Sequence, residues 1–510
     1  MELEFWDILI FLVFVFVVVG TSMYKSRKEE TGEDFFLASR GLVWPLIGIS
    51  LIAANISTEQ FVGMSGQGAG SVGLAIASYE WMAAITLVIV AFFFLPKFLS
   101  SGIYTIPEYL EYRYDSTARV IMAIYTMVIY VGVTIAAVLY SGGIMINTIF
   151  GLNLRCSIWI VGVIAALYAS WGGLKAVAWA DLFQGSALII GGGIVLYFGF
   201  NAIGGVEEFF VYNEDKLHMI LPANNEVLPW TALVIGLWIP NIYYWGLNQY
   251  ITQRTLAAKS LKEGQLGIIF AAGLKIIIPF VIVFPGIMAA QLYGDGMSNT
   301  DAAYPLLIKN LIPIGLKGFM LAAIAGAVMS SLASMLNSAS TIFTMDLYKK
   351  YLAKNPSQSK LVLVGRLMTI VFVLVGCLIA PELGNPRFQG IFTYIQEFQG
   401  YISPGILSAF LFGFVVKKAP PLAGVSALVV CVPVYGLLQF FAGEVAFLNR
   451  MAITFVVILL IMSIITLIKP LKKPVVFPQR QDYDIRPTPK VLWLGLTIIA
   501  ITIVLYIIFW

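Results

Sequence analysis

Residues 45–70 read PLIGISLIAANISTEQFVGMSGQGAG, an apolar stretch of membrane-spanning length with a polar interruption at its centre. A bilayer-spanning helix needs roughly 20 predominantly apolar residues. Here the amides, hydroxyls and carboxylate of residues 55–60 interrupt the apolar run, and glycines follow at 63, 66, 68 and 70. This pattern predicts a broken helix, whose exposed backbone carbonyls and helix ends can hold ions and substrate. The alternative interpretation is a kinked helix that packs tightly through its small residues.

The composition of the whole chain is that of a protein embedded in lipid. Of its 510 residues, 60% are hydrophobic and 11% are charged, and the mean hydropathy is +0.90. A soluble protein carries roughly 25% charged residues, so the composition excludes a soluble multidomain enzyme and a disordered chain. The net charge of +4 is too small to suggest nucleic acid as a partner. We expect one all-α polytopic transmembrane domain that covers residues 1–510.

The single histidine and the three cysteines offer no catalytic or metal-binding motif. His218 lies in a polar loop, and Cys156, Cys377 and Cys431 are far apart in the sequence. We therefore interpret the three cysteines as buried neutral thiols. An intramembrane enzyme would need paired acids, a metal cluster or a nucleophile with a base, and the sequence contains no such motif. No enzymatic activity is expected.

Hydropathy predicts fourteen spanning segments. Their approximate limits are 5–24, 45–70, 74–99, 118–149, 156–171, 175–201, 228–251, 263–292, 303–345, 361–380, 388–415, 420–441, 449–468 and 491–510. The chain opens with Met1-Glu2-Leu3-Glu4, without a basic leader or a cleavage site, so we expect the first segment to be a retained span.

The basic residues favour an orientation with both termini outside the cell. When the N-terminus is placed outside, the inner loops receive most of the lysines and arginines, including Arg254, Lys349 and Lys350. An even number of spans then returns the C-terminus to the outside.

Glu80, Asp181 and Lys275 are ionisable side chains within predicted spans, where charge is costly. Glu80 stands near the start of the third segment, and Asp181 lies early in the sixth. Each is interpreted either as a binding or transport residue or as an interfacial or ion-pairing carboxylate. Lys275 has only apolar neighbours in the sequence, so it must reach a cavity or a carboxylate on another helix. Glu80 is its expected partner.

Amides and aromatic rings occur together in two further segments. Residues 241–249 read NIYYWGLNQ, and Gln396 and Glu397 follow the stretch FTYI at 392–395. Amide side chains beside rings that can stack suit a neutral, hydroxyl-rich ligand such as a sugar. The alternatives are an interfacial aromatic belt for the first stretch and hydrogen bonds between helices for the second.

A row of serines in the ninth segment predicts a cation site. Ser330, Ser331, Ser334 and Ser338 have spacings that place them on one helix face. Sodium binds neutral hydroxyl and carbonyl oxygens, so a serine face opposite a broken helix predicts a sodium site. The alternative is that small residues simply let two helices pack closely.

These stretches together resemble the solute:sodium symporter family, and in particular its bacterial sodium/galactose branch. The resemblance covers nearly the whole chain, and several long stretches in the same order are more specific than one short motif. The matching stretches are NISTEQFVGM at 55–64, AIASYEWM at 75–82, GGLKAV at 172–177 with Asp181, NQYITQR at 248–254, the serine block at 330–338 and YIQE at 394–397.

The resemblance implies a LeuT-type fold and assigns roles to individual residues. The implied fold has inverted five-helix repeats at 45–201 and 228–415, an added N-terminal helix and loop at 5–44 and three added helices at 420–510. The implied hydrogen-bond partners of a hexose are Gln60, Glu80, Asn241, Lys275 and Gln396. The implied gates are Tyr244 on the inner side and Met64, Tyr79 and Phe392 on the outer side. The implied sodium ligands are the backbone carbonyls of Ala53, Ile56 and Ala327 and the hydroxyls of Ser330 and Ser331, with Asp181 as a coupling residue.

Three positions depart from the pattern of the family. Ala83 stands where the galactose branch has a serine near the sugar, which leaves both galactose and glucose open. Ala180 stands where the family often has threonine, and Ala333 stands where relatives resembling two-sodium transporters have serine. A second sodium site near Asp181 and Ser334 is therefore not expected, and we predict one sodium ion per sugar.

The resemblance predicts sodium-coupled import of galactose or glucose by alternating access, in a bacterial inner membrane. The main alternative is the same fold with another solute, such as myo-inositol, sialic acid, proline or pantothenate. A single lysine paired with a carboxylate favours a neutral polyol over an anion. An ion channel is a weaker alternative, because no selectivity-filter motif is evident. The sequence leaves the oligomeric state open between a monomer and a dimer.

Overall fold

The computed structural model describes residues 4–26, 31–171, 173–294, 297, 299–384, 391–478, 480, 484 and 488–510. These residues form helices and their connections, and the described part of the chain contains no strand. Gly172 of the GGLKAV stretch and residues 388–390 of the predicted eleventh segment lie outside the described residues.

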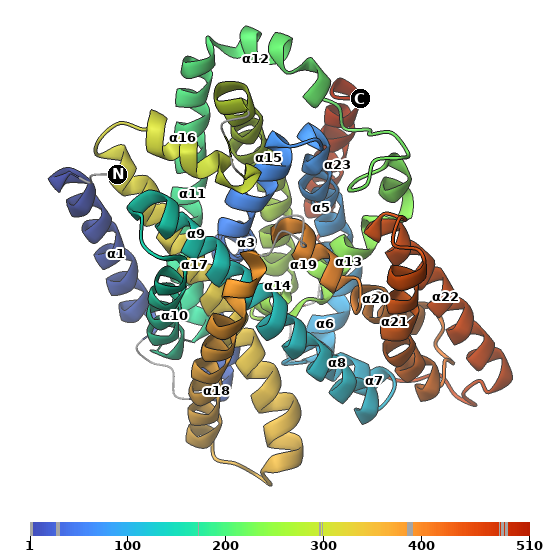
Figure 1. Cartoon of the computed structure of the whole chain (residues 1–510). Helices are drawn as coiled ribbons and strands as arrows, with labels where there is room; N and C mark the ends of the chain where they lie inside the picture. Colours follow the sequence, from blue (N-terminus) through green and yellow to red (C-terminus); the bar gives the residue numbers. More distant parts are fainter. Residues whose placement is uncertain are drawn as a thin grey trace.

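The helices follow one another along the whole chain. In chain order they are α1 (Phe5–Ser26), α2 (Gly32–Leu37), α3 (Trp44–Asn55), α4 (Ser65–Ala69), α5 (Ser78–Ile89), α6 (Leu95–Ser101), α7 (Ile106–Arg113), α8 (Ser116–Ile129), α9 (Ala136–Phe150), α10 (Leu154–Trp171), α11 (Leu174–Ile203), α12 (Val206–Tyr212), α13 (Trp238–Leu247), α14 (Gln249–Leu256), α15 (Leu261–Tyr293), α16 (Ala303–Leu311), α17 (Leu316–Ile342), α18 (Gln358–Ile379), α19 (Ile391–Gln399), α20 (Ser403–Val415), α21 (Pro421–Phe441), α22 (Phe447–Ile468) and α23 (Pro489–Ile508) (Figure 1). Short turns of other helix types include η2 (Gln60–Met64), η7 (Ala232–Gly236), η9 (Thr300–Ala302) and η10 (Phe343–Leu352).

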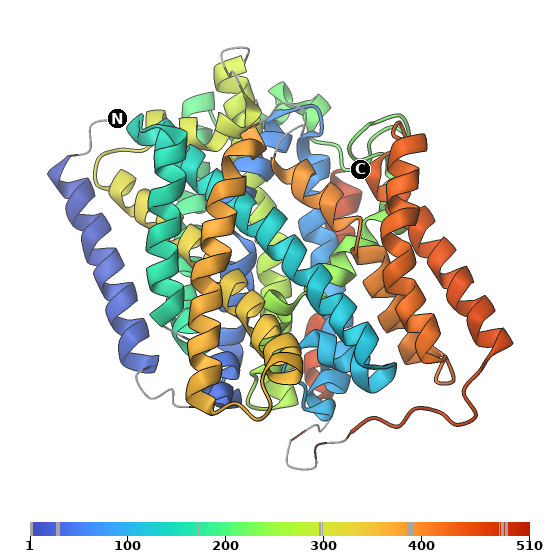
Figure 2. The same cartoon turned by 60° about the horizontal axis from the view of Figure 1, so that its bottom comes forward.

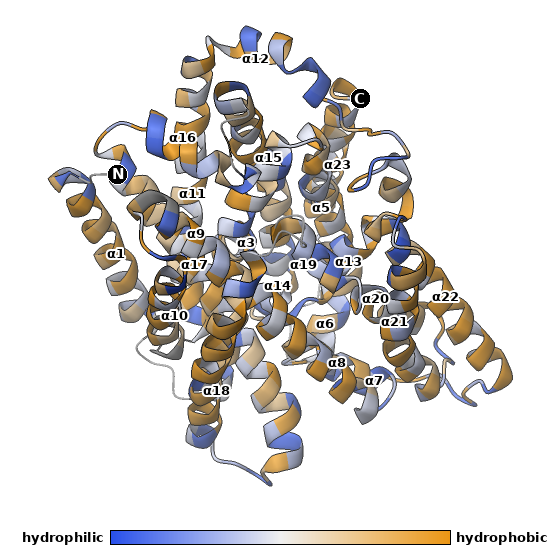
Figure 3. Ribbon diagram, in the orientation of Figure 1, coloured by the Kyte–Doolittle hydropathy of each residue, from blue (hydrophilic) through white to orange (hydrophobic). Residues whose placement is uncertain are grey.

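The long helices lie side by side, with α1 at one edge of the molecule and α22 at the opposite edge (Figure 2). Hydrophobic residues predominate on these two helices (Figure 3). Large apolar side chains such as Phe16 and Leu467 are about four-fifths exposed, at 79% and 82%. Such a surface is expected where helices face lipid instead of water.

The helix lengths agree with a polytopic membrane protein. In the described part of the chain, ten helices are long and apolar enough to cross a bilayer, and two bent helix pairs bring this number to twelve if each pair is one span. Two shorter apolar helices, Leu154–Leu167 and Ala232–Leu247, fall within the remaining predicted segments. The all-α membrane architecture is confirmed, and the count of fourteen spans stays a prediction.

The predicted interruption of the second segment is confirmed. Helix α3 ends at Asn55, and the chain resumes as η2 and α4 after a bend of 58°. Side chains within the break satisfy its backbone: the N–H of Ser57 donates to Gln60 Oε1 at 3.1 Å, and the N–H of Glu59 donates to Ser57 Oγ at 3.2 Å. The polar residues therefore stabilise the break by replacing lost helical hydrogen bonds.

A second break separates α13 from α14 at Asn248, whose backbone is extended. Tyr130 fixes this break, because its hydroxyl donates to Asn248 Oδ1 and accepts a hydrogen bond from the N–H of Tyr250 at 3.0 Å. A third bend of 45° separates α19 from α20.

The predicted ninth segment, 303–345, is wrong at its start. It contains two separate helices, α16 and α17. Ile312 has an extended backbone before Pro313, and the residue that precedes a proline is disfavoured from helical geometry. Gly315 then adopts a positive φ of 84° before α17 begins. The interpretation of Cys156 as a buried thiol is also wrong: it is exposed near the start of α10, whereas Cys377 and Cys431 are buried.

Candidate functional site

Helices α3, α5, α13 and α19 lie near the centre of the molecule (Figure 1). Residues of these helices and of η2 line a central cavity. Its cavity volume, the space open to water-sized molecules, is ≈ 50 Å³. All the predicted substrate and gate side chains line it except Lys275; they are Gln60, Met64, Tyr79, Glu80, Asn241, Tyr244, Phe392 and Gln396. The lining residues that were not assigned a role from the sequence include Asn55, Glu59, Thr134, Trp245, Tyr250 and Gln399.

Lys275 lies behind the cavity wall, on α15, and is fully buried. Its Nζ forms an ion pair with Glu80 and donates a hydrogen bond to Asn55. It also lies 4.7 Å from the centre of the Trp245 ring, a cation–π contact. The expected partnership of Lys275 with Glu80 is confirmed. Lys275 does not line the cavity itself, but it contacts Glu80, which does.

The amides and a second carboxylate present unused polar atoms. Asn241 donates from Nδ2 to the carbonyl of Leu237 at 3.2 Å, which leaves its Oδ1 as an acceptor. Within the described residues, Glu59 Oε2 is buried without a hydrogen-bond partner. Unsatisfied polar atoms are costly unless a ligand or water completes them. Glu59 was missed as a site residue, although it belongs to the same polar interruption as Gln60.

Aromatic side chains form two sides of the cavity. The rings of Tyr79 and Phe392 lie 4.9 Å apart and nearly perpendicular, at 89°. On another side, the hydroxyl of Tyr244 accepts a hydrogen bond from Asn55 Nδ2 at 3.0 Å and another from the Tyr250 hydroxyl. Tyr244 is therefore held in place by both broken helices. It does not belong to an interfacial aromatic belt, because it lines the central cavity.

The end of α3 and the serine face of α17 lie together. Ser331 Oγ donates to the carbonyl of Ala54 at 3.4 Å, and Ser330 Oγ donates to Asp181. In the last turn of α3, the carbonyl of Ile52 accepts the N–H of Ile56 and that of Asn55 accepts the N–H of Ser57. The carbonyls of Ala53 and Ala54 receive no helical N–H four residues on, because the helix stops at Asn55. Hydroxyl and carbonyl oxygens thus gather at the break, and this is the donor set that suits sodium.

Asp181 is the centre of a buried network that the sequence did not reveal. Arg254 lies fully buried beside it, with Nη2 3.1 Å from Asp181 Oδ2 and Nε donating to Ser50 Oγ at 2.6 Å. Arg254 also donates to the hydroxyl of Ser334 and to the carbonyl of Tyr250. The prediction that Arg254 lies in an inner loop is wrong, because α14 continues into the protein after the break. Such a guanidinium is tolerated only where acceptors surround it.

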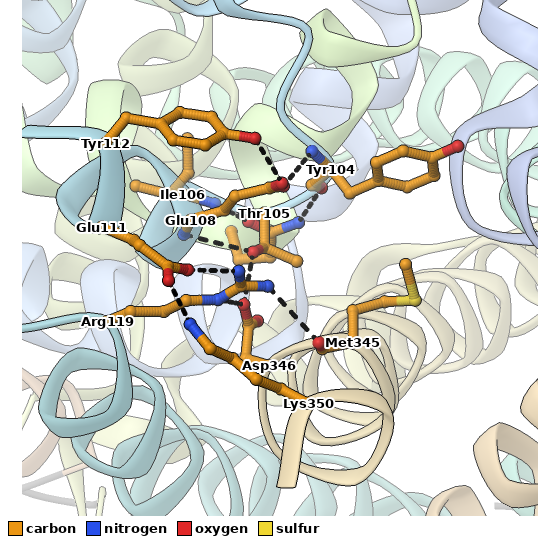
Figure 4. Close-up of polar contacts among 11 residues, drawn as sticks. Tyr104, Thr105, Ile106, Glu108, Glu111, Tyr112, Arg119, Met345, Asp346 and Lys350 are labelled. Atoms are coloured by element: carbon orange, nitrogen blue, oxygen red, sulfur yellow. Dashed lines mark hydrogen bonds and ion pairs between the residues drawn. The ribbon is translucent and has the colours of Figure 1, made fainter. Parts of the chain in front are cut away.

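A second polar cluster joins α7, α8 and η10, away from the cavity (Figure 4). Arg119 pairs with Asp346 at 2.5 Å and with Glu111 at 2.7 Å, and Lys350 also pairs with Glu111. Thr105 donates to Asp346 at 2.9 Å. Although partial burial opposes it, the ion pairs with Lys350 and Arg119 lower the pKa of Glu111 below its ordinary value.

Gln249 connects this cluster to the second helix break. Its Oε1 accepts the N–H of Ile106 at 2.8 Å, and its Nε2 donates to the carbonyl of Tyr104 at 3.2 Å. Because Gln249 opens α14, the connection between α6 and α7 is tied to the half-helix that carries Arg254.

A buried carboxylate lies in the loop region between α15 and α16. Asp301 lies in η9, where its side chain approaches Gly66 of α4 so closely that a Cβ there would stand 2.9 Å from Oδ1. Burial raises the pKa of Asp301 from 3.8 to about 6, against the opposing hydrogen bonds of Ile391 and Asn299. A carboxyl group whose pKa is higher in the folded than in the unfolded chain lowers the stability of the protein at pH values where the group is ionised.

Asp301→Asn is therefore expected to stabilise the protein at pH 8 and to have little effect below pH 4. Folded Asp301 holds its proton up to about pH 6, while the unfolded chain releases it near 3.8, so stability falls between these values as pH rises. The asparagine removes this loss of about 3 kcal/mol. Thermal unfolding of detergent-purified protein at both pH values measures it, with the exposed Asp215→Asn as control. An equal shift at both pH values contradicts the prediction.

Comparison with known proteins gives consistent results. A sequence model of the sodium:solute symporter family matches residues 35–430. The chain is 43% identical over 496 residues to a sodium/glucose cotransporter of Vibrio parahaemolyticus, with 91% of each chain covered. It is 34% identical to a sodium/myo-inositol cotransporter 2 of Sus scrofa, with 83% of this chain and 67% of the relative covered.

Solved structures show the same fold. A sodium-coupled sialic acid symporter in a substrate-bound, outward-open state matches with a TM-score of 0.82 at 24% identity, covering 93% of this chain and 100% of that one. A nucleobase-cation-symport-1 family transporter in a closed conformation matches with a TM-score of 0.56 at 15% identity, covering 88% of this chain and 98% of that one.

Proposed function

The chain belongs to the sodium:solute symporter family, and from this premise we propose that it imports a neutral hexose, galactose or glucose, with one sodium ion per sugar. Sodium is the coupling ion of the family, and the protein is a polytopic membrane transporter of LeuT-type fold, not an enzyme. The observation that carries the choice of a neutral sugar is the cavity in which Gln60, Glu80, Asn241 and Gln396 meet.

The charges of the cavity favour a neutral substrate. None of the described residues that line it is basic, and the one buried lysine nearby is paired with Glu80. An anion such as sialate would leave its carboxylate without a cation, which is costly away from water. A sugar instead offers hydroxyls, which both donate to Glu80 and accept from the amides. This argument also admits myo-inositol, and it disfavours sialic acid and pantothenate.

In this proposal Lys275 orients the Glu80 carboxylate, so that its oxygens accept hydrogen bonds from sugar hydroxyls. Glu59 adds a second carboxylate with an unpartnered oxygen. Tyr244 is the inner gate that stacks on the sugar ring. Met64, Tyr79 and Phe392 are the outer gate, supported by the contact between the last two rings.

The proposed sodium site uses the carbonyls of Ala53, Ile56 and Ala327 and the hydroxyls of Ser330 and Ser331. Asp181 is the coupling residue, and it acts through Ser330: a hydroxyl that donates its proton to the carboxylate keeps its lone pairs for the cation. One sodium per sugar is supported by Arg254, whose fixed positive charge lies between Asp181 and Ser334, where a second sodium would need to bind.

Coupling follows from a difference in affinity between states. Sodium joins α17 to the break after α3, and this fixes Asn55, Tyr244 and Gln60 for the sugar. Sugar binding then closes the outer gate, and the helix bundle rocks to face inward. The cluster of Arg119, Asp346, Glu111 and Lys350 must rearrange when the inner side opens.

The proposed architecture has inverted repeats at 45–201 and 228–415. The first segment of each is a broken helix, one at residue 56 and the other at Asn248, as a duplicated unit predicts. The helix and loop at 5–44 and the three helices at 420–510 are additions. The proposed location is a bacterial inner membrane with both termini outside, supported by the distribution of basic residues.

Labelled galactose uptake into proteoliposomes, with and without an inward sodium gradient, tests this function. We expect sodium-dependent uptake that Gln60→Ala lowers at least tenfold, because one hydrogen bond to a sugar held by a carboxylate-rich site is worth about 1.5 kcal/mol or more. Gln67→Ala, outside the cavity on α4, is the matched control. Competition by unlabelled glucose, myo-inositol, sialic acid, proline and pantothenate ranks the solutes. Uptake inhibited by sialate but not by hexoses would contradict the neutral-sugar proposal.

A further inference from the structure

Arg366 is a charged side chain on an outward helix face. It is the ninth residue of α18, so its Cα lies about 12 Å from the start of the helix. Its side chain is exposed, as are those of Leu363, Leu367 and Ile370 around it. Among the described residues, no acidic group forms an ion pair with Arg366.

An arginine in this position has no anionic partner among the described residues. Charged residues in spanning helices normally face the bundle interior or pair with one another. Arg366 does neither. Its long side chain can extend toward the membrane surface, where the nearest anions are lipid phosphates.

Arg366 lines one part of a groove between α10 and α18. The groove has a volume of ≈ 670 Å³, and the rest of its lining is uncharged. Leu167 and Val163 line it from α10, and Ile370 and Leu374 line it from α18. The groove therefore combines one cation with an extended apolar wall, which matches the two parts of a phospholipid.

We propose that this groove binds one anionic phospholipid of the cytoplasmic leaflet. The Arg366 guanidinium donates hydrogen bonds to the phosphate, and an acyl chain lies along the apolar wall toward Trp159. The planar guanidinium fits phosphate oxygens in a bidentate manner, and basic pockets between spanning helices are known sites for anionic head groups. The orientation proposed above places this end of α18 inside, because Lys349, Lys350 and Lys354 precede it.

Native mass spectrometry of the delipidated full chain in detergent tests the site, with phosphatidylglycerol and phosphatidylcholine as probes. We expect one phosphatidylglycerol to bind to the wild type at least tenfold more tightly than phosphatidylcholine. Arg366→Gln should lose this preference. Ile370→Trp, which fills the groove and keeps the arginine, should weaken both lipids. Arg155→Gln, at the exposed start of α10, should change neither.

Melting temperatures within two degrees or so of the wild type verify that the variants fold, since all three positions are exposed. Retention of the wild-type preference by Arg366→Gln overturns the proposal. Equal binding of the two lipids to the wild type also overturns it. If Ile370→Trp converts a dimer into a monomer without changing lipid binding, a second copy of the chain covers the groove and the lipid proposal is wrong.

Discussion

Lys275→Met is expected to abolish sodium-driven sugar uptake and to lower the free energy of unfolding by about 3–5 kcal/mol. The lysine on α15 is fully buried and pairs with Glu80 on α5. Methionine keeps much of the side-chain volume, so the packing survives while the carboxylate loses its cation. A buried charge without a partner costs several times what the intact pair contributes, because its desolvation is no longer compensated.

The double variant Lys275→Met with Glu80→Gln separates stability from transport. Removing both charges leaves no uncompensated ion, so most of the lost stability should return. Uptake should remain absent, because the neutral amide no longer accepts sugar hydroxyls as the carboxylate does. Denaturant unfolding and proteoliposome uptake measure the two effects, with the exposed Lys262→Met as control. If the single variant transports normally, the lysine has only a structural role.

The sequence predicts that Lys275 pairs with an acidic side chain, because an unpaired lysine inside an apolar span is energetically costly. A lysine surrounded by Ile, Leu and Gly has no local partner, so an acid on another helix had to supply one. What the sequence cannot give is the geometry. The two residues are 195 positions apart, and the lysine lies behind the wall of the cavity because Asn55 and Trp245 also hold it.

The prediction that places Arg254 in an inner loop is also wrong for a physical reason. In the sequence it follows a run of polar residues, which is typical of a loop. The structure turns these residues into α14, a second half-helix whose polar side chains point to other polar side chains inside the bundle. Hydropathy averages over such a helix and cannot tell a polar loop from a polar interior. Likewise, the average hydropathy of residues 303–345 did not reveal that one helix ends before Pro313 and another begins after it.

The two buried pairs divide the site between substrate and ion. Lys275 balances a carboxylate that lines the central cavity, and Arg254 balances a carboxylate that contacts the serine face. Both cations come from the second proposed repeat, and both acids come from the first. In the proposed alternating-access cycle, each pair links the two proposed repeats beside the proposed ligand site. This explains why fixed charges are retained at a depth where they are costly.

Arg254→Met is expected to reduce stability by about 3–5 kcal/mol in choline buffer and by clearly less in sodium buffer. Without the guanidinium, Asp181 becomes a buried carboxylate surrounded by the hydroxyls of Ser50 and Ser330, which are oxygen donors for a cation. A sodium ion can then supply the missing charge. Binding to the folded state alone stabilises it in proportion to the logarithm of the ion concentration.

The same substitution should raise the ratio of sodium to sugar flux from one toward two. This follows because the Arg254 charge, which we propose takes the place of a second ion between Asp181 and Ser334, is gone. Asp181→Asn added to Arg254→Met removes the attracting carboxylate, so the sodium dependence of stability and the higher flux ratio should both disappear. A wild-type ratio near two would show instead that a second ion binds despite Arg254. In that case the guanidinium would serve to tie α14 to α11, and the limit of one sodium ion would have no electrostatic basis.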